Sequence, residues 1–138
     1  MNRFRRLRQN QAIRRLVQET EISPKDLIYP IFIIEGENIK EPIESMPGVY
    51  RYSIDKIDEI LEEVSKSGIS GMLLFGVPAH KDSVGSEAYN ENGVTQRAIR
   101  YIKAKYPNML VIADICLCEY TSHGHCGLIS GNEILNDE

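Results

Sequence analysis

Three cysteines and two histidines lie within the eleven residues from 116 to 126, directly after an apolar run that includes Asp114. The cysteines are Cys116, Cys118 and Cys126, and the chain has no others. Thiolate sulfur is a soft ligand that suits zinc; a structural zinc site usually has four protein ligands, whereas a catalytic one has three and an open position. Three cysteines without a fourth therefore indicate an open, catalytic metal site.

Three other interpretations of this cluster stay open on the residues alone. His123 or His125 could complete a structural site with three cysteines and one histidine. The cysteines could instead be buried, reduced and inert, since free cysteine is among the most buried residue types. Asp114 could serve only to cap the turn after its strand, because aspartate favours turns.

Alternating apolar and amphipathic segments indicate how the cluster is positioned. Unbroken apolar runs predict strands buried on both faces at residues 27–34, 71–77 and 109–115. Helical periodicity predicts one helix from an N-cap at Ser53 to Gly68 and another from Val94 to Pro107. Strands alternating with helices indicate parallel βαβ units, so the fold class is α/β. Asp114 and the cysteines then follow the carboxyl end of the third strand, where such proteins place their chemistry.

Three local features qualify this pattern. Pro30 indicates that the first strand is not hydrogen-bonded on both sides throughout. Pro42, Pro47 and Gly48 predict a loop before the first helix. The polar loop from Pro78 to Gly93 is longer than a simple connection needs, which favours a lid or a subunit contact.

Composition limits the class of protein. The chain has 138 residues, 42% hydrophobic and 26% charged, which is typical of one globular domain. It has no apolar stretch long enough to span a membrane and no secretory signal, so we expect a cytoplasmic protein without a membrane partner. In that reducing setting, clustered cysteines favour metal binding over disulfides. The net charge of -4 argues against a general nucleic-acid binder.

The amino terminus is a basic arm. Six arginines lie within the first fifteen residues: Arg3, Arg5, Arg6, Arg8, Arg14 and Arg15. Such an arm favours an acidic target, which could be a nucleic acid, an import receptor or a neighbouring subunit, unless it is only a solvated basic end. Apolar residues at roughly helical spacing, Leu7, Ile13, Leu16 and Val17, indicate that part of the arm docks.

The segment from Asp114 to Gly127 closely resembles the metal-site signature of the porphobilinogen synthase family, also called 5-aminolevulinate dehydratase. The resemblance extends in order and spacing over essentially the whole chain, through residues 5–8, 26–32, 35–43, 45–51 and 74–78. It implies a zinc-dependent lyase that condenses two molecules of 5-aminolevulinate to porphobilinogen, with loss of water, in haem biosynthesis. It also implies a (β/α)8 TIM barrel, with an arm at residues 1–22 and the first part of a single barrel domain at 23–138.

The resemblance further implies roles for particular residues. Cys116, Cys118 and Cys126 match the cysteines that hold the catalytic Zn²⁺, and Asp114 matches a catalytic aspartate beside that metal. Mg²⁺ is an activator in full-length members of the family. The family's arm embraces a neighbouring subunit in a homo-octamer, which would give the arginines an acidic protein surface.

One part of the family pattern is missing. The family forms Schiff bases through two lysines on later strands, and the lysines here fall in polar loops or on helices: Lys25, Lys40, Lys56, Lys66, Lys81, Lys103 and Lys105. An eight-stranded barrel needs about 250 residues, and residues 136–138 resemble the family's lead-in to its next helix, so the sequence ends inside a βα unit. We therefore expect an inactive, aggregation-prone amino-terminal fragment. One alternative is an inactive short zinc-binding assembly or regulatory partner of a full-length enzyme. Another is a small zinc module that binds nucleic acid, which would need a second ligand pair and a basic domain.

Overall fold

The computed structural model describes residues 5–131 and 133–135. Five strands form one sheet in the order β2-β3-β1-β4-β5, and β6 and β7 form a separate hairpin. The expectations for Arg3 and for the chain end at 136–138 lie outside the described residues. The strands are β1 (Ile28–Ile34), β2 (Lys40–Pro42), β3 (Tyr50–Tyr52), β4 (Gly71–Val77), β5 (Leu110–Ala113), β6 (Leu128–Ser130) and β7 (Glu133–Leu135); the helices are α1 (Gln11–Leu16), α2 (Asp58–Ser67) and α3 (Val94–Lys105).

The α/β prediction is confirmed by the pairing of the strands. β1 pairs in parallel with β3 and β4, and β4 pairs in parallel with β5, while β2 adds an antiparallel strand at one edge. Ile31 is in register with Leu74, and Leu74 with Ala113. The carboxyl ends of β1, β4 and β5 therefore meet at one edge of the sheet.

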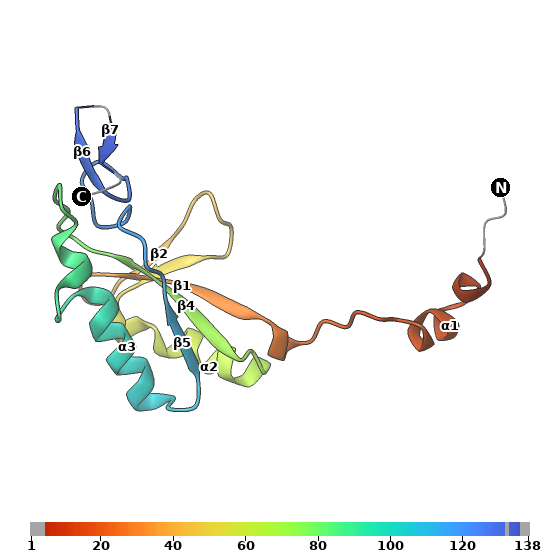
Figure 1. Cartoon of the computed structure of the whole chain (residues 1–138). Helices are drawn as coiled ribbons and strands as arrows, with labels where there is room; N and C mark the ends of the chain where they lie inside the picture. The colour runs from red at the N-terminus through yellow and green to blue at the C-terminus, as the bar shows by residue number, and fades with distance from the viewer. Residues whose placement is uncertain (1–4, 132, 136–138) are drawn as a thin grey trace.

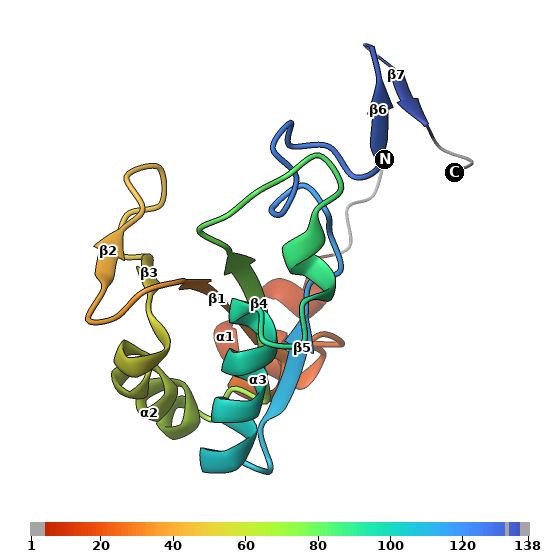
Figure 2. The ribbon, with the colours of Figure 1, turned by 90° about the vertical axis from the view of Figure 1, so that its left-hand side faces the viewer.

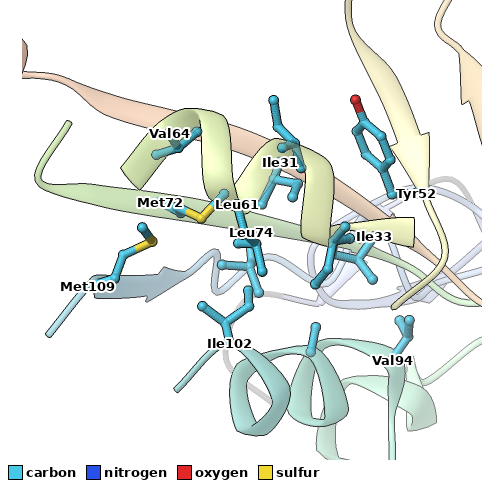
Figure 3. Packing of buried hydrophobic residues seen from close by; sticks show 13 residues of the cluster. Ile31, Ile33, Tyr52, Leu61, Val64, Met72, Leu74, Val94, Ile102 and Met109 are labelled. Atoms are coloured by element: carbon cyan, nitrogen blue, oxygen red, sulfur yellow. The ribbon is translucent and has the colours of Figure 1, made fainter. Parts of the chain in front are cut away.

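The hydrophobic core lies between the sheet and the helices α2 and α3, which both lie below the sheet in Figure 1. Alternate residues of the strands join it, including Ile31 and Ile33 of β1 and Met72 and Leu74 of β4. Figure 3 shows these side chains packed with those of the two helices. Leu61 of α2 is fully buried in this cluster.

The prediction that the strands are buried on both faces is wrong for these residues. The burial of β1 alternates, and so does that of β4 after its first residues. Phe32 and Phe75 point away from the helices, stack with their ring centroids 5.1 Å apart, and stay only half-buried. The reason is that α2 and α3 cover the same face of the sheet.

Pro30 lies where the sequence predicted incomplete pairing, and the prediction is confirmed. β3 pairs with β1 only at Phe32 and Ile33, whereas β4 runs along the whole of β1. Pro30 therefore has a ladder neighbour on one side only. Its missing N–H leaves no partner unsatisfied there.

Two local predictions need correction. The segment expected to be a loop around Pro42 and Gly48 contains the short strands β2 and β3. The first long helix begins at Asp58 and not after a cap at Ser53. The Ser53 hydroxyl is buried and accepts a hydrogen bond from the Ile39 N–H at 2.8 Å, so it ties the two chain segments together instead of capping α2. Gly68, at φ 78°, ends α2 in the left-handed conformation as predicted.

The arm extends away from the sheet, as Figure 1 shows. Its helix α1 is capped by Asn10, whose side chain accepts a hydrogen bond from the Ile13 N–H at 2.9 Å. None of the α1 residues is buried, and Leu16 is 85% exposed. Within the described residues, no helix is long and apolar enough to cross a membrane.

Candidate metal centre

The cysteines lie in a loop that leaves the carboxyl end of β5, and residues 114–127 are called the cysteine loop below. The backbone N–H of Asp114 still donates to the Leu74 carbonyl at 3.1 Å, so the loop starts from a fixed point beside β4. The next residue, Ile115, is 98% exposed. The sequence prediction that the loop begins at the carboxyl edge of the parallel sheet is thus confirmed, although β5 ends two residues earlier than expected.

The loop brings the three thiols together. The Sγ atoms of Cys116, Cys118 and Cys126 all lie within 4.8 Å of one another. Cys116 Sγ and Cys126 Sγ are 3.4 Å apart, and all three thiols are free. Cys126 is exposed and the other two are half-buried, so the interpretation of buried, inert cysteines does not fit. Three convergent soft donors, open to solvent on one side, fit a thiophilic divalent cation.

Turns inside the loop close the gap of ten residues between the outer cysteines. The Tyr120 and Thr121 N–H groups both donate to the Leu117 carbonyl at 2.9 Å. The Thr121 hydroxyl then donates to the His125 carbonyl at 3.0 Å, and Gly124 reverses the chain with φ 74°. These contacts return the chain so that Cys126 lies beside Cys116.

The pKa values of the Cys116 and Cys126 thiols are shifted in opposite directions. The Leu117 N–H donates to Cys126 Sγ at 3.0 Å, and this bond is the main reason why the pKa of Cys126 is lowered. The Cys118 N–H acts in the same direction on Cys116, but the neighbouring thiols of Cys126 and Cys118 outweigh it and leave the pKa of Cys116 at about 11. Cys126 therefore ionises before Cys116, with the Cys116 thiol as its hydrogen-bond donor.

Neither histidine belongs to the convergent set. Among residues 5–131 and 133–135, the three cysteines alone form the group of potential ligands. One ring nitrogen of His123 lies 3.2 Å from the Ser83 carbonyl, and the other accepts from the His125 N–H at 3.2 Å. The backbone thus engages both nitrogens of His123. The geometry favours the three-thiol site over one completed by His123.

Two carboxyl groups accompany the thiols, and sequence reasoning found only one. Asp114 is half-buried, and among the described residues its carboxylate accepts no hydrogen bond from the turn, which leaves the turn-cap interpretation unsupported. Glu119 was missed, although its place between Cys118 and Tyr120 was a signal. Burial, followed by the negative charge of Asp114, raises the pKa of Glu119 to about 7, and its buried Oε2 has no hydrogen-bond partner within residues 5–131 and 133–135. Glu119 can therefore give or accept a proton near neutral pH.

A hollow of about 310 Å³ connects this site to α3. Asp114 and Cys116 line it from the loop, and Thr95 and Gln96 line it from the helix. The Oε1 of Gln96 is buried there without a hydrogen-bond partner among the described residues. The site therefore combines three metal donors, a carboxylate and a space with free polar groups.

Comparison with known proteins gives a consistent result. The family described as delta-aminolevulinic acid dehydratase matches residues 1–138. The chain is 54% identical to the delta-aminolevulinic acid dehydratase of Ruminiclostridium josui, over 99% of this chain and 67% of that protein. It is 54% identical to that of Halalkalibacterium halodurans, over 98% of this chain and 41% of that protein. It therefore spans about two thirds of the first relative and less than half of the second.

A solved structure resembles the fold. The delta-aminolevulinic acid dehydratase (porphobilinogen synthase) of Toxoplasma gondii, in complex with its reaction product porphobilinogen, matches with a TM-score of 0.88 at 38% identity. The match covers 99% of this chain and 40% of that chain. The parallel sheet and its covering helices are thus common to both.

Proposed function

The chain belongs to the delta-aminolevulinic acid dehydratase family, and we propose that it supplies the metal-binding part of the active site of a porphobilinogen synthase. That enzyme condenses two molecules of 5-aminolevulinate to porphobilinogen and water. The observation that carries the proposal is the convergence of three Sγ atoms within 4.8 Å at the carboxyl end of β5. The names of the relatives and the product bound to the Toxoplasma protein support the substrate class.

We propose zinc as the metal, because three thiolates favour a soft, thiophilic ion over magnesium. Zn²⁺ together with the thiolates of Cys116, Cys118 and Cys126 would carry a net negative charge, and it would supply a mild Lewis acid able to polarise a substrate carbonyl or amine. Asp114 would hold a substrate amine in its charged form by pairing with it.

The lysines of this chain do not fit the Schiff-base role. That role needs a desolvated lysine with a lowered pKa. Lys105 pairs with Asp58 at 2.5 Å, Lys66 with Glu62 at 2.6 Å, and these hydrogen bonds raise the pKa of each lysine. We propose that the reacting lysines are absent from this sequence, and that the 138 residues alone form no porphobilinogen.

The arrangement around the site supports two further parts of the proposal. Residues 23–138 would form the beginning of a (β/α)8 barrel, because one edge of β5 has no partner strand in the described part of the chain and the face with Phe32 and Phe75 is only half-buried. Residues 1–22 would form the arm that contacts a second copy of the chain in a homo-oligomer. The exposed apolar side chains of Leu16 and Ile22, 85% and 78% exposed, support this contact.

A zinc titration under reducing conditions tests the metal site. We expect one Zn²⁺ per chain, and Cys126→Ser should weaken binding by more than the ~10–100-fold loss that follows from removing a group that only supports a ligand. The matched control is His125→Ala, which should leave stoichiometry and affinity unchanged. Unchanged binding by Cys126→Ser would refute the three-thiolate site, and loss of binding by His125→Ala would favour the site with one histidine.

An activity assay tests the remaining part. The purified chain should produce no porphobilinogen from 5-aminolevulinate, with or without Zn²⁺. Measurable product would show that a lysine of this chain can form the Schiff base. Each of the seven lysines would then be a candidate for substitution.

A further inference from the structure

The long polar loop between β4 and α3, residues 78–93, lies against the cysteine loop. Figure 2 shows the two loops side by side above the sheet, one in green and the other in blue. Asp82 and Thr121 form an isolated parallel bridge, and the Ser122 N–H donates to the Asp82 carbonyl at 2.8 Å. The sequence interpretation of this loop as a lid or a subunit contact missed this role.

The approach of the two loops is close along several residues. The His123 ring lies 3.2 Å from the Ser83 carbonyl. At Gly85, a Cβ atom would stand 3.4 Å from side-chain atoms of Leu117, Tyr120 and Thr121. Gly85 also has φ 65°, so this position combines a left-handed backbone with packing against the cysteine loop. The 78–93 loop is therefore a fixed support for the cysteine loop.

A single carboxylate fixes the shape of that support. Asp82 Oδ1 accepts hydrogen bonds from the Val84 and Ser86 N–H groups, each at 3.0 Å. Asp82 Oδ2 accepts from the Ser86 hydroxyl. These bonds, first of all that from the Ser86 hydroxyl, lower the pKa of Asp82 to about 2, so it is a carboxylate at every physiological pH. The same residue thus organises its own turn with its side chain and holds the cysteine loop with its backbone.

The contact reaches the metal ligands through Thr121. This residue is only 2% exposed, and its bridge to Asp82 fixes its backbone. Its hydroxyl donates to the carbonyl of His125, the residue that precedes Cys126. A shift of the Asp82 turn would therefore move Thr121, and with it the backbone that places Cys126 beside Cys116.

We propose that Asp82 is a positioning residue for the metal centre, whose hydrogen-bonded turn holds the three thiols in their convergent arrangement before a metal binds. The inference rests on the proposed metal site. It adds a residue distant in sequence from the cysteines and assigns a role to the 78–93 loop.

The first test needs no metal. Dibromobimane bridges two thiols that lie close together, and its fluorescence reports the bridge. All chains compared in this test, the wild type included, carry Cys118→Ser, so the reaction of the metal-free 138-residue chain measures how often Cys116 and Cys126 are adjacent. We expect Asp82→Ala to slow bridging by about 10-fold, because the turn loses all its side-chain contacts. Asp82→Asn should stay within about twofold of the wild type, since its Oδ1 can still accept both backbone N–H groups. Asp58→Asn is the matched control, because Asp58 is another hydrogen-bonded aspartate with a lowered pKa but joins α2 to α3.

The second test uses Co²⁺ as a probe, whose thiolate charge-transfer absorption reports the ligand set. We expect Asp82→Ala to weaken Co²⁺ binding by about 10–100-fold and to diminish this absorption, and Asp82→Asn to restore both. If Asp82→Ala does not fold, Ser86→Ala removes one of the three contacts and should slow bridging by about 2–5-fold.

The outcomes separate the two proposals. Equal bridging rates in the wild type and in Asp82→Ala or Ser86→Ala would overturn the positioning role, whether or not the chain binds metal. Equal losses in Asp82→Ala and Asp58→Asn would also overturn it, because the effect would then reflect general destabilisation. A wild type that bridges its thiols and binds no Co²⁺ would refute the metal site of the proposed function, while the bridging rates would still decide the role of Asp82.

Discussion

Different forces stabilise two regions of the molecule. One region is the face of the sheet that the helices cover, and the other is the pair of loops beyond the carboxyl ends of its strands. The core between the sheet and the helices α2 and α3 consists of apolar side chains with little or no exposure, among them Ile33, Leu61 and Ile102 (Figure 3). Burial of this kind is nondirectional, and it contributes roughly 1.5–3 kcal/mol for each large side chain. Such a region tolerates small displacements as long as it stays filled.

The two loops at the other end are organised by directional contacts. Their thiols and carboxylates are half-buried or exposed. Hydrogen bonds that Asp82 accepts, and those that Thr121 and Leu117 donate, fix their positions. A hydrogen bond fixes a distance and an angle but contributes only about 0.5–1.5 kcal/mol net. The difference shows that most of the folding free energy comes from one region and the geometry needed for chemistry from the other.

The largest loss of stability is expected from a substitution that disrupts the core and leaves the loops intact. Leu61 is fully buried in α2, so Leu61→Ala removes buried methyl groups and leaves a cavity. We expect a loss of about 2–5 kcal/mol in the free energy of unfolding, measured by urea denaturation. At low temperature, where the variant stays folded, the rate of thiol bridging should remain that of the wild type.

Glu62→Ala is the control for this variant. Glu62 is the next residue on α2, its side chain is 61% exposed, and it forms an ion pair with Lys66. It should change the stability by no more than about 0.5 kcal/mol. Slow bridging in folded Leu61→Ala would show that the core also sets the thiol geometry, and the contrast between the two regions would fail.

The next effect concerns the residue that belongs to both regions. Tyr120 lies in the cysteine loop, yet it is 5% exposed, and its hydroxyl is 2.8 Å from that of Thr95 on α3. Tyr120→Phe leaves the buried Thr95 hydroxyl without its partner, which should cost about 1–3 kcal/mol. Thr95→Val should cost a similar amount for the same reason.

The double variant sharpens this test. With both hydroxyls removed, no buried polar group is left unpaired, so the double variant should lose clearly less stability than the sum of the single losses. Denaturation of the four proteins gives this coupling free energy. Additive losses would mean that the hydrogen bond does not join the loop to α3.

A smaller effect should appear in how the free energy of unfolding depends on pH, through the carboxylate of Asp82. Hydrogen bonds lower the pKa of Asp82 from 3.8 to about 2, so its carboxylate form favours the folded state. This stabilisation should be fully present above about pH 4 and disappear as the pH falls toward 2. The measurement compares the unfolding of the metal-free wild type and Asp82→Asn at several pH values.

The difference between the two proteins should be constant from pH 7 to 5 and shrink below pH 4. Asp58→Asn provides a second pair, because the pKa of Asp58 is lowered by its hydrogen bond to Lys105. A difference for Asp82→Asn that does not change with pH would show that the carboxylate charge does not stabilise the turn.

The sequence predicted the regular part of the fold well because that part follows simple periodicity. The runs around Ile31, Met72 and Val111 became the parallel strands β1, β4 and β5, and Gly68 ended α2. The short strands β2 and β3 were missed, since a strand of three residues is too short to carry a periodic signal. The burial of both faces was overestimated, because an apolar run does not show on which face the helices pack.

The sequence predicted that the three cysteines converge, but not the residues that support their arrangement. The types and spacing of the cysteines were enough to expect that they converge, because thiols clustered in one short loop have few other uses in a reducing environment. Asp82 could not be identified, because its role depends on a contact with Thr121 that lies 39 residues away and becomes visible only when β4 and β5 are adjacent. The raised pKa of Glu119 likewise depends on burial, which the sequence does not show.

The arm should respond least of all in the isolated chain, because it shares neither the apolar burial of the core nor the hydrogen bonds of the loops. Leu16 is 85% exposed on α1, so Leu16→Ser should change the unfolding free energy by no more than about 0.5 kcal/mol. The proposed contact with a second copy predicts a different result for self-association, because the exposed side chain would then be buried at an interface. Sedimentation over a range of concentrations should show weaker association for Leu16→Ser than for the wild type, while Gln11→Ala on the same helix should associate as the wild type does. Equal association of all three would remove the arm from the interface, and a large loss of stability in Leu16→Ser would show that the arm packs on its own chain.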